Sequence, residues 1–213
     1  MRKTKIICTL GPAIDSDEML KKMIKNGLDC ARLNFSHGTH EEHLTRIERV
    51  KRVRKELGMY IPILLDTKGP EIRLKKFEND SVIVEQGQKF TLYADDRIGN
   101  KEGISITYSN LASVLKVGTK ILIDDGKVEI EVTELSGSDV ICKVNNGGKL
   151  SNNKSINIPG CSIDMPYISE RDKSDILFGI KNDVDFIAAS FVRTKDDVWD
   201  LRRLLNDNGG EEI

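Results

Sequence analysis

The sequence lacks the features that mark secreted, membrane-spanning or nucleic-acid-binding proteins. Its 33 basic and 34 acidic residues nearly cancel, so no global field draws the chain to nucleic acid or to a membrane surface. No apolar run has the length of a membrane-spanning helix, and the N-terminal stretch MRKTKIICTLGPA lacks the pattern of a signal peptide. We therefore expect a cytoplasmic protein with neither nucleic acid nor membrane as a partner.

Cysteine is scarce, and no two cysteines form a CxxC pair. Cys8, Cys30 and Cys142 lie in apolar, strand-like runs, which favours buried, reduced thiols over disulfides. The chain also has no GxGxxG, P-loop or GxSxG motif. Any active site must therefore be recognised from less familiar segments.

Strands and helices alternate at both ends of the chain. Short apolar runs predict parallel strands at residues 5–10, 29–34, 61–66 and 185–190. Capping patterns at Ser16, Thr39, Ser169 and Thr194 predict that a helix begins after each. Such alternation predicts a parallel sheet with right-handed crossovers.

The middle of the chain follows a different pattern. From Gly69-Pro70 to Pro166, short alternating runs replace any helical period, and Asp124-Asp125-Gly126 is a hairpin signal. We therefore expect an α/β fold: a truncated (β/α)8 TIM-type barrel of about four strand–helix units, with an inserted all-β barrel domain. The predicted domains are 1–70, the first part of the barrel, 71–166, the β-barrel lid, and 167–213, the barrel's continuation, cut before its second half.

Polar residues gather where the second and third strands end. Arg32 has the forked donors to bind an anion, although an ion pair with Asp66 is an equal alternative. Asn34, Ser36 and Asp66 offer neutral oxygens and one carboxylate, a set that suits a hard monovalent cation. Plain capping and turn chemistry is the competing interpretation.

Three histidines, His37, His40 and His43, recur at intervals of three residues. A zinc site is one interpretation. However, His37 precedes the predicted helix while the other two lie in its first turns, and no cysteine completes a tetrahedral set. We do not expect the three rings to converge on a metal.

Several segments closely resemble pyruvate kinases. These are MRKTKIICTLGPA, ARLNFSHG, LLDTKGPEIR, NNGGKLSNNKSINIPG and ISERDKSDILFGIKNDVDFIAASFVR, which together run over essentially the whole chain. The resemblance implies transfer of a phosphoryl group from phosphoenolpyruvate to ADP, giving pyruvate and ATP in glycolysis. It also implies Mg²⁺ and K⁺ as cofactors and a homotetrameric complete enzyme.

The resemblance assigns roles residue by residue. Arg32 would contact the substrate phosphoryl group. Nucleotide binding would fall to Arg73, Lys154 and His37, and K⁺ would be held by Asn34, Ser36, Asp66 and the Thr67 carbonyl.

One departure from the family pattern limits these assignments. The catalytic lysine and most Mg²⁺ ligands of pyruvate kinases follow a GGE-like stretch, and this chain ends at Gly209-Gly210-Glu211-Glu212-Ile213. We therefore expect no catalytic residue within the 213 residues, an N-terminal fragment inactive by itself, and self-association through open sheet edges. Two rival hypotheses are another phosphoenolpyruvate-utilising barrel enzyme, a carboligase or lyase, and a non-enzymatic β-barrel binding module on a half-barrel base.

Overall fold

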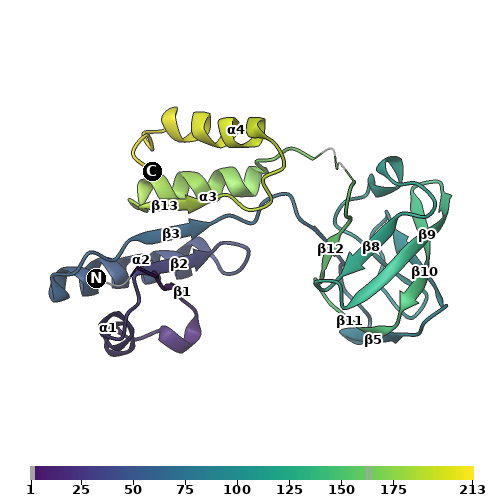
Figure 1. Ribbon diagram of the computed structural model, residues 1–213, viewed down its shortest axis with the longest axis horizontal. Coiled ribbons are helices and arrows are strands. Elements are labelled where there is room, and N and C mark those ends of the chain that lie inside the picture. Colours follow the sequence, from purple (N-terminus) through teal and green to yellow (C-terminus); the bar gives the residue numbers. More distant parts are fainter. Residues whose placement is uncertain (1–2, 162, 164) are drawn as a thin grey trace. The chain divides into compact units, whose positions relative to one another are not determined.

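The protein divides into two compact units. The computed structural model describes residues 3–161, 163 and 165–213. The α/β unit comprises Met1–Pro70 and Pro166–Ile213, and the β unit comprises Glu71–Met165 (Figure 1). The chain leaves the α/β unit after Pro70 and re-enters it at Pro166, a residue that the sequence pattern had placed at the end of the middle domain.

Four parallel strands form the sheet of the α/β unit, and they lie in chain order. Adjacent pairs are parallel, with Thr9 opposite Arg32 and Asn34 opposite Asp66. Because all four run the same way, their carboxyl ends lie at one edge of the sheet. The strands are β1 (Ile7–Thr9), β2 (Cys30–Asn34), β3 (Ile63–Asp66) and β13 (Phe186–Ala188), in the order β1-β2-β3-β13.

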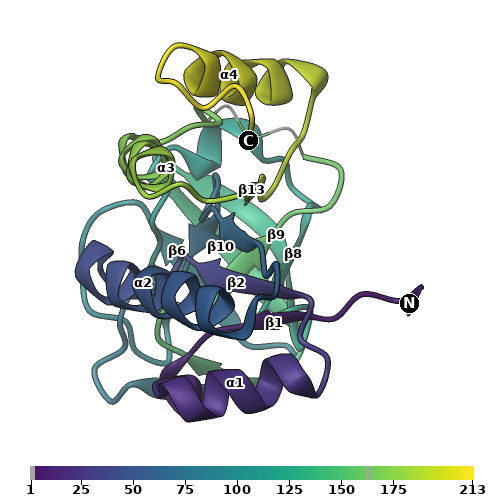
Figure 2. The same ribbon diagram turned by 90° about the vertical axis from the view of Figure 1, so that its left-hand side faces the viewer.

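One helix follows each of these strands. A 3-10 turn comes before the first helix, and the β unit comes before the third. The helices are α1 (Asp17–Lys25), α2 (His40–Leu57), α3 (Glu170–Lys181) and α4 (Lys195–Asn206), and a 3-10 turn spans Pro12–Ile14. Helix α1 packs beside α2, and α3 beside α4 (Figure 2). Leu33, Val50 and Leu65 are fully buried between the sheet and the helices. The predicted caps form, including a complete capping box of Thr39 with Glu42.

One predicted core position in α4 is wrong. The spacing of apolar residues in this helix predicts that Val198, Leu201, Leu204 and Leu205 are buried, and Leu204 is only partly so. Leu201 and Leu205 are buried, but Val198 is 50% exposed, as is its neighbour Trp199 at 60%. The buried stripe of α4 is therefore narrower than the apolar stripe in its sequence.

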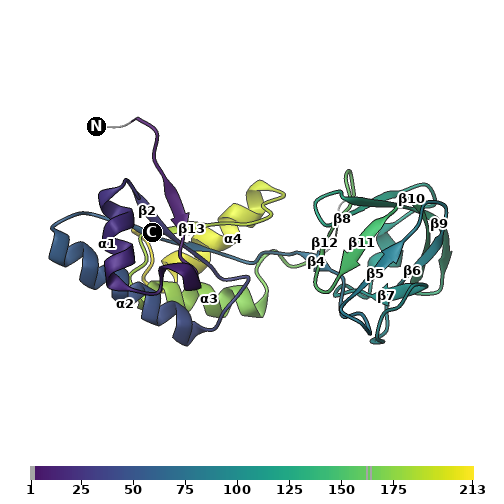
Figure 3. The same cartoon turned by 90° about the horizontal axis from the view of Figure 1, so that it is seen from below.

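The β unit is built from short, mainly antiparallel strands around its own core. Fully buried side chains such as Phe90, Leu92 and Ile130 fill that core. Its strands are β4 (Ile72–Arg73), β5 (Ser81–Val84), β6 (Lys89–Tyr93), β7 (Gly103–Ser105), β8 (Lys120–Ile123), β9 (Val128–Ser136), β10 (Asp139–Asn146), β11 (Gly148–Ser151) and β12 (Ser155–Asn157). Seven form one sheet in the order β4-β12-β8-β9-β10-β6-β7, while β5 and β11 pair separately (Figure 3).

Turn chemistry in the β unit follows the sequence. The predicted hairpin at Asp124-Asp125-Gly126 joins β8 to β9, and all three residues have positive φ. Among the described residues of this unit, the one helical element is a 3-10 turn at Leu111–Val114.

Candidate functional site

The carboxyl ends of β2 and β3 meet as the sequence predicted. Asn34 lies opposite Asp66, and the Phe35 amide donates to the Asp66 carbonyl oxygen at 3.0 Å. On the other side of β3, Asp66 lies opposite Ala188 of β13. The last residues of three strands are therefore fixed side by side by backbone pairing.

Arg32 is paired with Asp66, which was one of its two predicted roles. Its Nε donates to Asp66 Oδ2 at 2.9 Å, Nη2 contacts the same oxygen, and Nη1 contacts Thr9 Oγ1. A guanidinium has five N–H donors, and these contacts use three. The Arg32 side chain is also one third exposed, at 32%. The ion pair therefore leaves two donors for an anion.

Ser190 also belongs to this cluster, and sequence reasoning missed it. Its Oγ donates to Asp66 Oδ1 at 2.9 Å, so both carboxylate oxygens of Asp66 have partners. Its amide donates to Thr67 Oγ1 at 3.2 Å, and the buried Thr67 donates in turn to the Ala188 carbonyl. The available signal was a hydroxyl at the end of the fourth predicted strand, since the second and third strand ends already carried polar residues.

The loop after β2 turns back on Asn34. The Ser36 amide donates to Asn34 Oδ1 at 3.0 Å, and the His37 amide donates to the Asn34 carbonyl at 3.3 Å. This turn holds the Asn34 amide oxygen beside Ser36. The turn chemistry offered as a competing interpretation therefore exists, and it holds the Ser36 backbone against the Asn34 side chain.

The three histidines have separate partners. His43 Nε2 donates to the His37 carbonyl at 2.8 Å, whereas His40 Nε2 lies 2.6 Å from Asp175 Oδ1. Burial lowers the pKa of His43 below its usual range, so its ring is neutral at pH 7. Among residues 3–161, 163 and 165–213, no three His, Cys, Asp or Glu side chains are grouped to hold a metal.

A small cavity adjoins the exposed His37. Its volume is 310 Å³, and it lies within the α/β unit between the end of β1 and the start of α2. Thr9, Asn34, His37 and Arg46 are among its lining residues. The cavity therefore shares Asn34 with the strand-end cluster.

Of the two predicted residues of the β unit, Arg73 lies in β4 and Lys154 directly precedes β12. Arg73 in β4 pairs with Ser155 in β12, which directly follows Lys154. Arg73 Nε forms an ion pair with Glu71 at 2.7 Å, and Lys154 Nζ forms one with Asp124 at 2.9 Å. Hydrogen bonds from Lys154 and Lys127 lower the pKa of the Asp124 carboxyl. Each of the two cations thus has an acidic partner within this unit.

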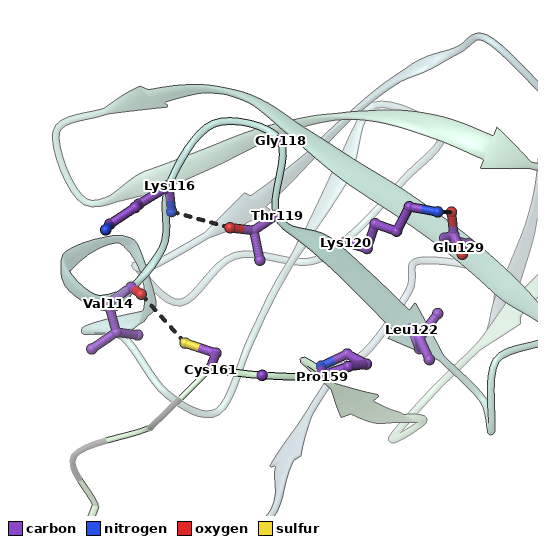
Figure 4. A pocket seen from close by; sticks show the side chains of 10 residues that line it. Val114, Lys116, Gly118, Thr119, Lys120, Leu122, Glu129, Pro159 and Cys161 are labelled. Atoms are coloured by element: carbon purple, nitrogen blue, oxygen red, sulfur yellow. Dashed lines mark hydrogen bonds and ion pairs between the residues drawn. The ribbon is translucent and has the colours of Figure 1, made fainter.

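A second cavity lies in the β unit, and the described residues that line it include none of the predicted site residues. It measures 620 Å³ and opens beside β8 (Figure 4). Lys120 and Glu129 form an ion pair at 3.0 Å on one wall, and Cys161 contacts the Val114 carbonyl on another. Its polar groups are thus mostly paired with one another.

Comparison with known proteins identifies the family. A family model described as pyruvate kinase, barrel domain, matches residues 1–213. The chain belongs to the pyruvate kinase family. The resemblance carried by LNFSHG and DTKGPEIR is therefore confirmed, and the rival hypothesis of a carboligase or lyase is wrong.

Individual pyruvate kinases match the chain from end to end. The enzyme of Staphylococcus haemolyticus JCSC1435 is 47% identical over 100% of this chain and 37% of its own length. That of Staphylococcus epidermidis RP62A is 46% identical over 99% of the chain and 36% of its own. The crystal structure of a Cryptosporidium parvum pyruvate kinase matches with a TM-score of 0.89 and 38% identity, over 98% of this chain and 44% of the other. The chain thus spans little more than a third of its curated relatives, and no described helix has the length and apolarity to cross a membrane.

Proposed function

We propose that these residues form part of the active site of an enzyme that transfers a phosphoryl group from phosphoenolpyruvate to ADP. Family membership supports the reaction, and the strand-end cluster supports the place. The observation that carries the proposal is the pairing of Arg32 with Asp66 between two neighbouring strands, with two guanidinium donors left over. In this proposal Arg32 binds the phosphoryl oxygens of the substrate.

We propose K⁺ as the cation of this cluster, held by Asn34, Ser36, Asp66 and the Thr67 carbonyl. The donor set fits, because it consists of hard oxygens with one formal negative charge. Asp66 Oδ2 accepts from Arg32 and Asp66 Oδ1 accepts from Ser190. A carboxylate accepts about four hydrogen bonds or ligands in total. Bound K⁺ would add fixed positive charge near the transferring phosphoryl group, where electrostatic stabilisation matters most.

Nucleotide binding is proposed for three further residues. His37 lines the 310 Å³ cavity, Arg73 lies in β4, and Lys154 directly precedes β12, the strand with which β4 pairs. Cations suit phosphate groups, and Arg can bind them with two donors. We propose that the β unit is a lid inserted in a (β/α)8 barrel. The unit is inserted between β3 and β13, and the four strands β1, β2, β3 and β13 lie side by side in chain order, as in such a barrel. Mg²⁺ ligands are proposed to lie mostly outside these 213 residues, and the homotetramer remains a prediction.

The test uses an enzyme of the relatives' full length that carries these residues, called the complete enzyme below. Pyruvate formation is measured with phosphoenolpyruvate, ADP and Mg²⁺ while K⁺ is varied. We expect Arg32→Ala to lower kcat/KM for phosphoenolpyruvate by about 100-fold, in line with the loss of one stabilising group. Asp66→Asn and Ser36→Ala should weaken K⁺ activation more than ADP affinity.

Arg52→Ala is the matched control, because Arg52 is an exposed arginine of α2 whose partner is Asp17. Its kinetics should equal those of the wild type. Wild-type K⁺ dependence in both the Asp66 and Ser36 variants would refute the cation site, and unchanged kcat/KM in the Arg32 variant would refute the phosphoryl site.

A further inference from the structure

Ser36, a proposed K⁺ ligand, lies between two peptide carbonyls that are both held by side chains from helices. The Phe35 carbonyl accepts a hydrogen bond from Arg171 Nη2 of α3 at 2.9 Å. The His37 carbonyl accepts one from His43 Nε2 of α2 at 2.8 Å. Helix side chains therefore hold the peptide plane that precedes Ser36 and the one that follows His37.

The amide groups of the same segment are held from the sheet side. The Phe35 amide donates to the Asp66 carbonyl, and the Ser36 and His37 amides donate to Asn34. The three amides from Phe35 to His37 and the carbonyls of Phe35 and His37 thus all have partners. Hydroxyl placement at Ser36 depends on these planes, since χ1 is the side chain's only heavy-atom torsion.

Ring packing adds a second constraint on this loop. Phe35 is buried, and its ring stacks on that of His43 with centroids 3.9 Å apart. The His40 ring stacks on Phe178 of α3 with centroids 4.4 Å apart. The loop is therefore packed against rigid elements, the arrangement that a site of fixed geometry requires.

Asp175 links the two helices behind the loop. This residue is buried in α3, and its Oδ1 lies 2.6 Å from His40 Nε2 of α2. Its Oδ2 lies 3.7 Å from Arg171 Nε, one turn earlier on the same helix. The carboxylate thus forms an ion pair, without a hydrogen bond, with the guanidinium whose Nη2 donates to the Phe35 carbonyl.

We propose that Arg171 and His43 are positioning residues for Ser36 and thereby for the K⁺ site, with Asp175 orienting Arg171. This inference rests on the proposed function. Neither residue would contact the cation; Arg171 holds the carbonyl of the residue before Ser36, and His43 holds the carbonyl of the residue after it. Groups that orient metal ligands typically contribute 10–100-fold to metal affinity, so the loss of one should be measurable in K⁺ activation.

The principal variant is Arg171→Met in the complete enzyme, since Met keeps the length of the side chain but donates no hydrogen bond. We expect the K⁺ concentration for half-activation to rise about tenfold, with kcat at saturating K⁺ within about twofold of the wild type. Arg171→Lys retains a donor and should recover part of the K⁺ affinity. Lys173→Met is the matched control, on the same helix and exposed, and should leave K⁺ activation unchanged.

A second variant tests the other carbonyl. His43→Gln places an amide N–H near the position of Nε2, whereas His43→Leu removes the donor and should weaken K⁺ activation more. The K⁺-dependent rise in Tm, measured for every variant, gives a readout of cation binding that is independent of turnover. A merely structural role would lower Tm without changing the K⁺ concentration required.

The outcomes separate this inference from the proposed function. If K⁺ activates the wild type, and Arg171→Met needs the same K⁺ concentration for half-activation, the positioning role alone is overturned. A wild type without any K⁺ response, in activity or in Tm, would overturn the K⁺ site and the positioning role together. A tenfold shift in Arg171→Met but not in Lys173→Met would support both.

Discussion

Asp172 holds together the two connections between the units, and its replacement by alanine should destabilise the α/β unit strongly. The carboxylate is buried, at 2% exposure. Its Oδ1 accepts from the Gly69 amide at 3.1 Å, and its Oδ2 accepts from Ser169 Oγ at 2.5 Å. Gly69 lies where the chain leaves the α/β unit, and Ser169 lies just after its return.

The expected cost follows from what the substitution leaves behind. Hydrogen bonds to a charged group contribute about 1.5–3 kcal/mol each, and a buried donor left without a partner costs about 1–3 kcal/mol. Loss of a negative charge in the first turn of α3 adds about 0.3–1 kcal/mol. Because burial of the carboxylate also costs desolvation energy, which the substitution recovers, we expect the free energy of unfolding to fall by about 3 kcal/mol.

Chemical denaturation of the 213-residue chain provides the measurement. Trp199 is its one tryptophan, and it lies in α4, so its fluorescence reports on the α/β unit. Asp196→Ala is the matched control, because Asp196 is an exposed acid in the first turn of α4 and should lose less than about 1 kcal/mol. A free energy of unfolding for Asp172→Ala within about 0.5 kcal/mol of the control would refute the reasoning.

Two further predictions concern stability. Gly69→Ala should lower the free energy of unfolding by about 3 kcal/mol, since φ is +68° and the new Cβ would lie 2.6 Å from the Ser190 carbonyl oxygen. Gly58→Ala, at φ +61° but with open space around the new Cβ, should lower it by about 1 kcal/mol. Equal losses for the two variants in urea denaturation would contradict the steric argument. Asp124→Asn should flatten the pH dependence of Tm below about pH 4, because the folded protein lowers the pKa of this carboxyl. The charged carboxylate stabilises the fold at pH values above its pKa in the unfolded chain, about 3.9, and this contribution is lost as pH falls through the folded pKa. Parallel Tm curves for the variant and the wild type from pH 6 to pH 2.5 would exclude it.

Features set by neighbours in sequence were predictable. Thr39 caps α2 and Glu42 completes the box within one helical turn, so residue identity and spacing suffice. Asp172 shows where this ends. The pattern predicted a box with Ser169, and the Ser169 cap forms, but the Asp172 carboxylate bonds the Gly69 amide, 103 residues earlier. A pattern within one helix carries no information about such a partner.

The strand-end cluster was predictable in part for a topological reason. Parallel strands place their carboxyl ends at one edge, so adjacent strands bring Asn34 beside Asp66 wherever β2 pairs with β3. Ser190 needed more, because its contact with Asp66 depends on β13 pairing with β3 across the whole inserted β unit. The order of the strands had to be known before its hydroxyl could be assigned.

The histidines show how one sequence pattern can serve different chemistry. A zinc site was one interpretation of their spacing, and the sequence did not favour it. His43 donates to a loop carbonyl, and His40 pairs with the Asp175 side chain, 135 residues later. Spacing along α2 carries no information about either partner, because one belongs to the loop before the helix and the other to α3.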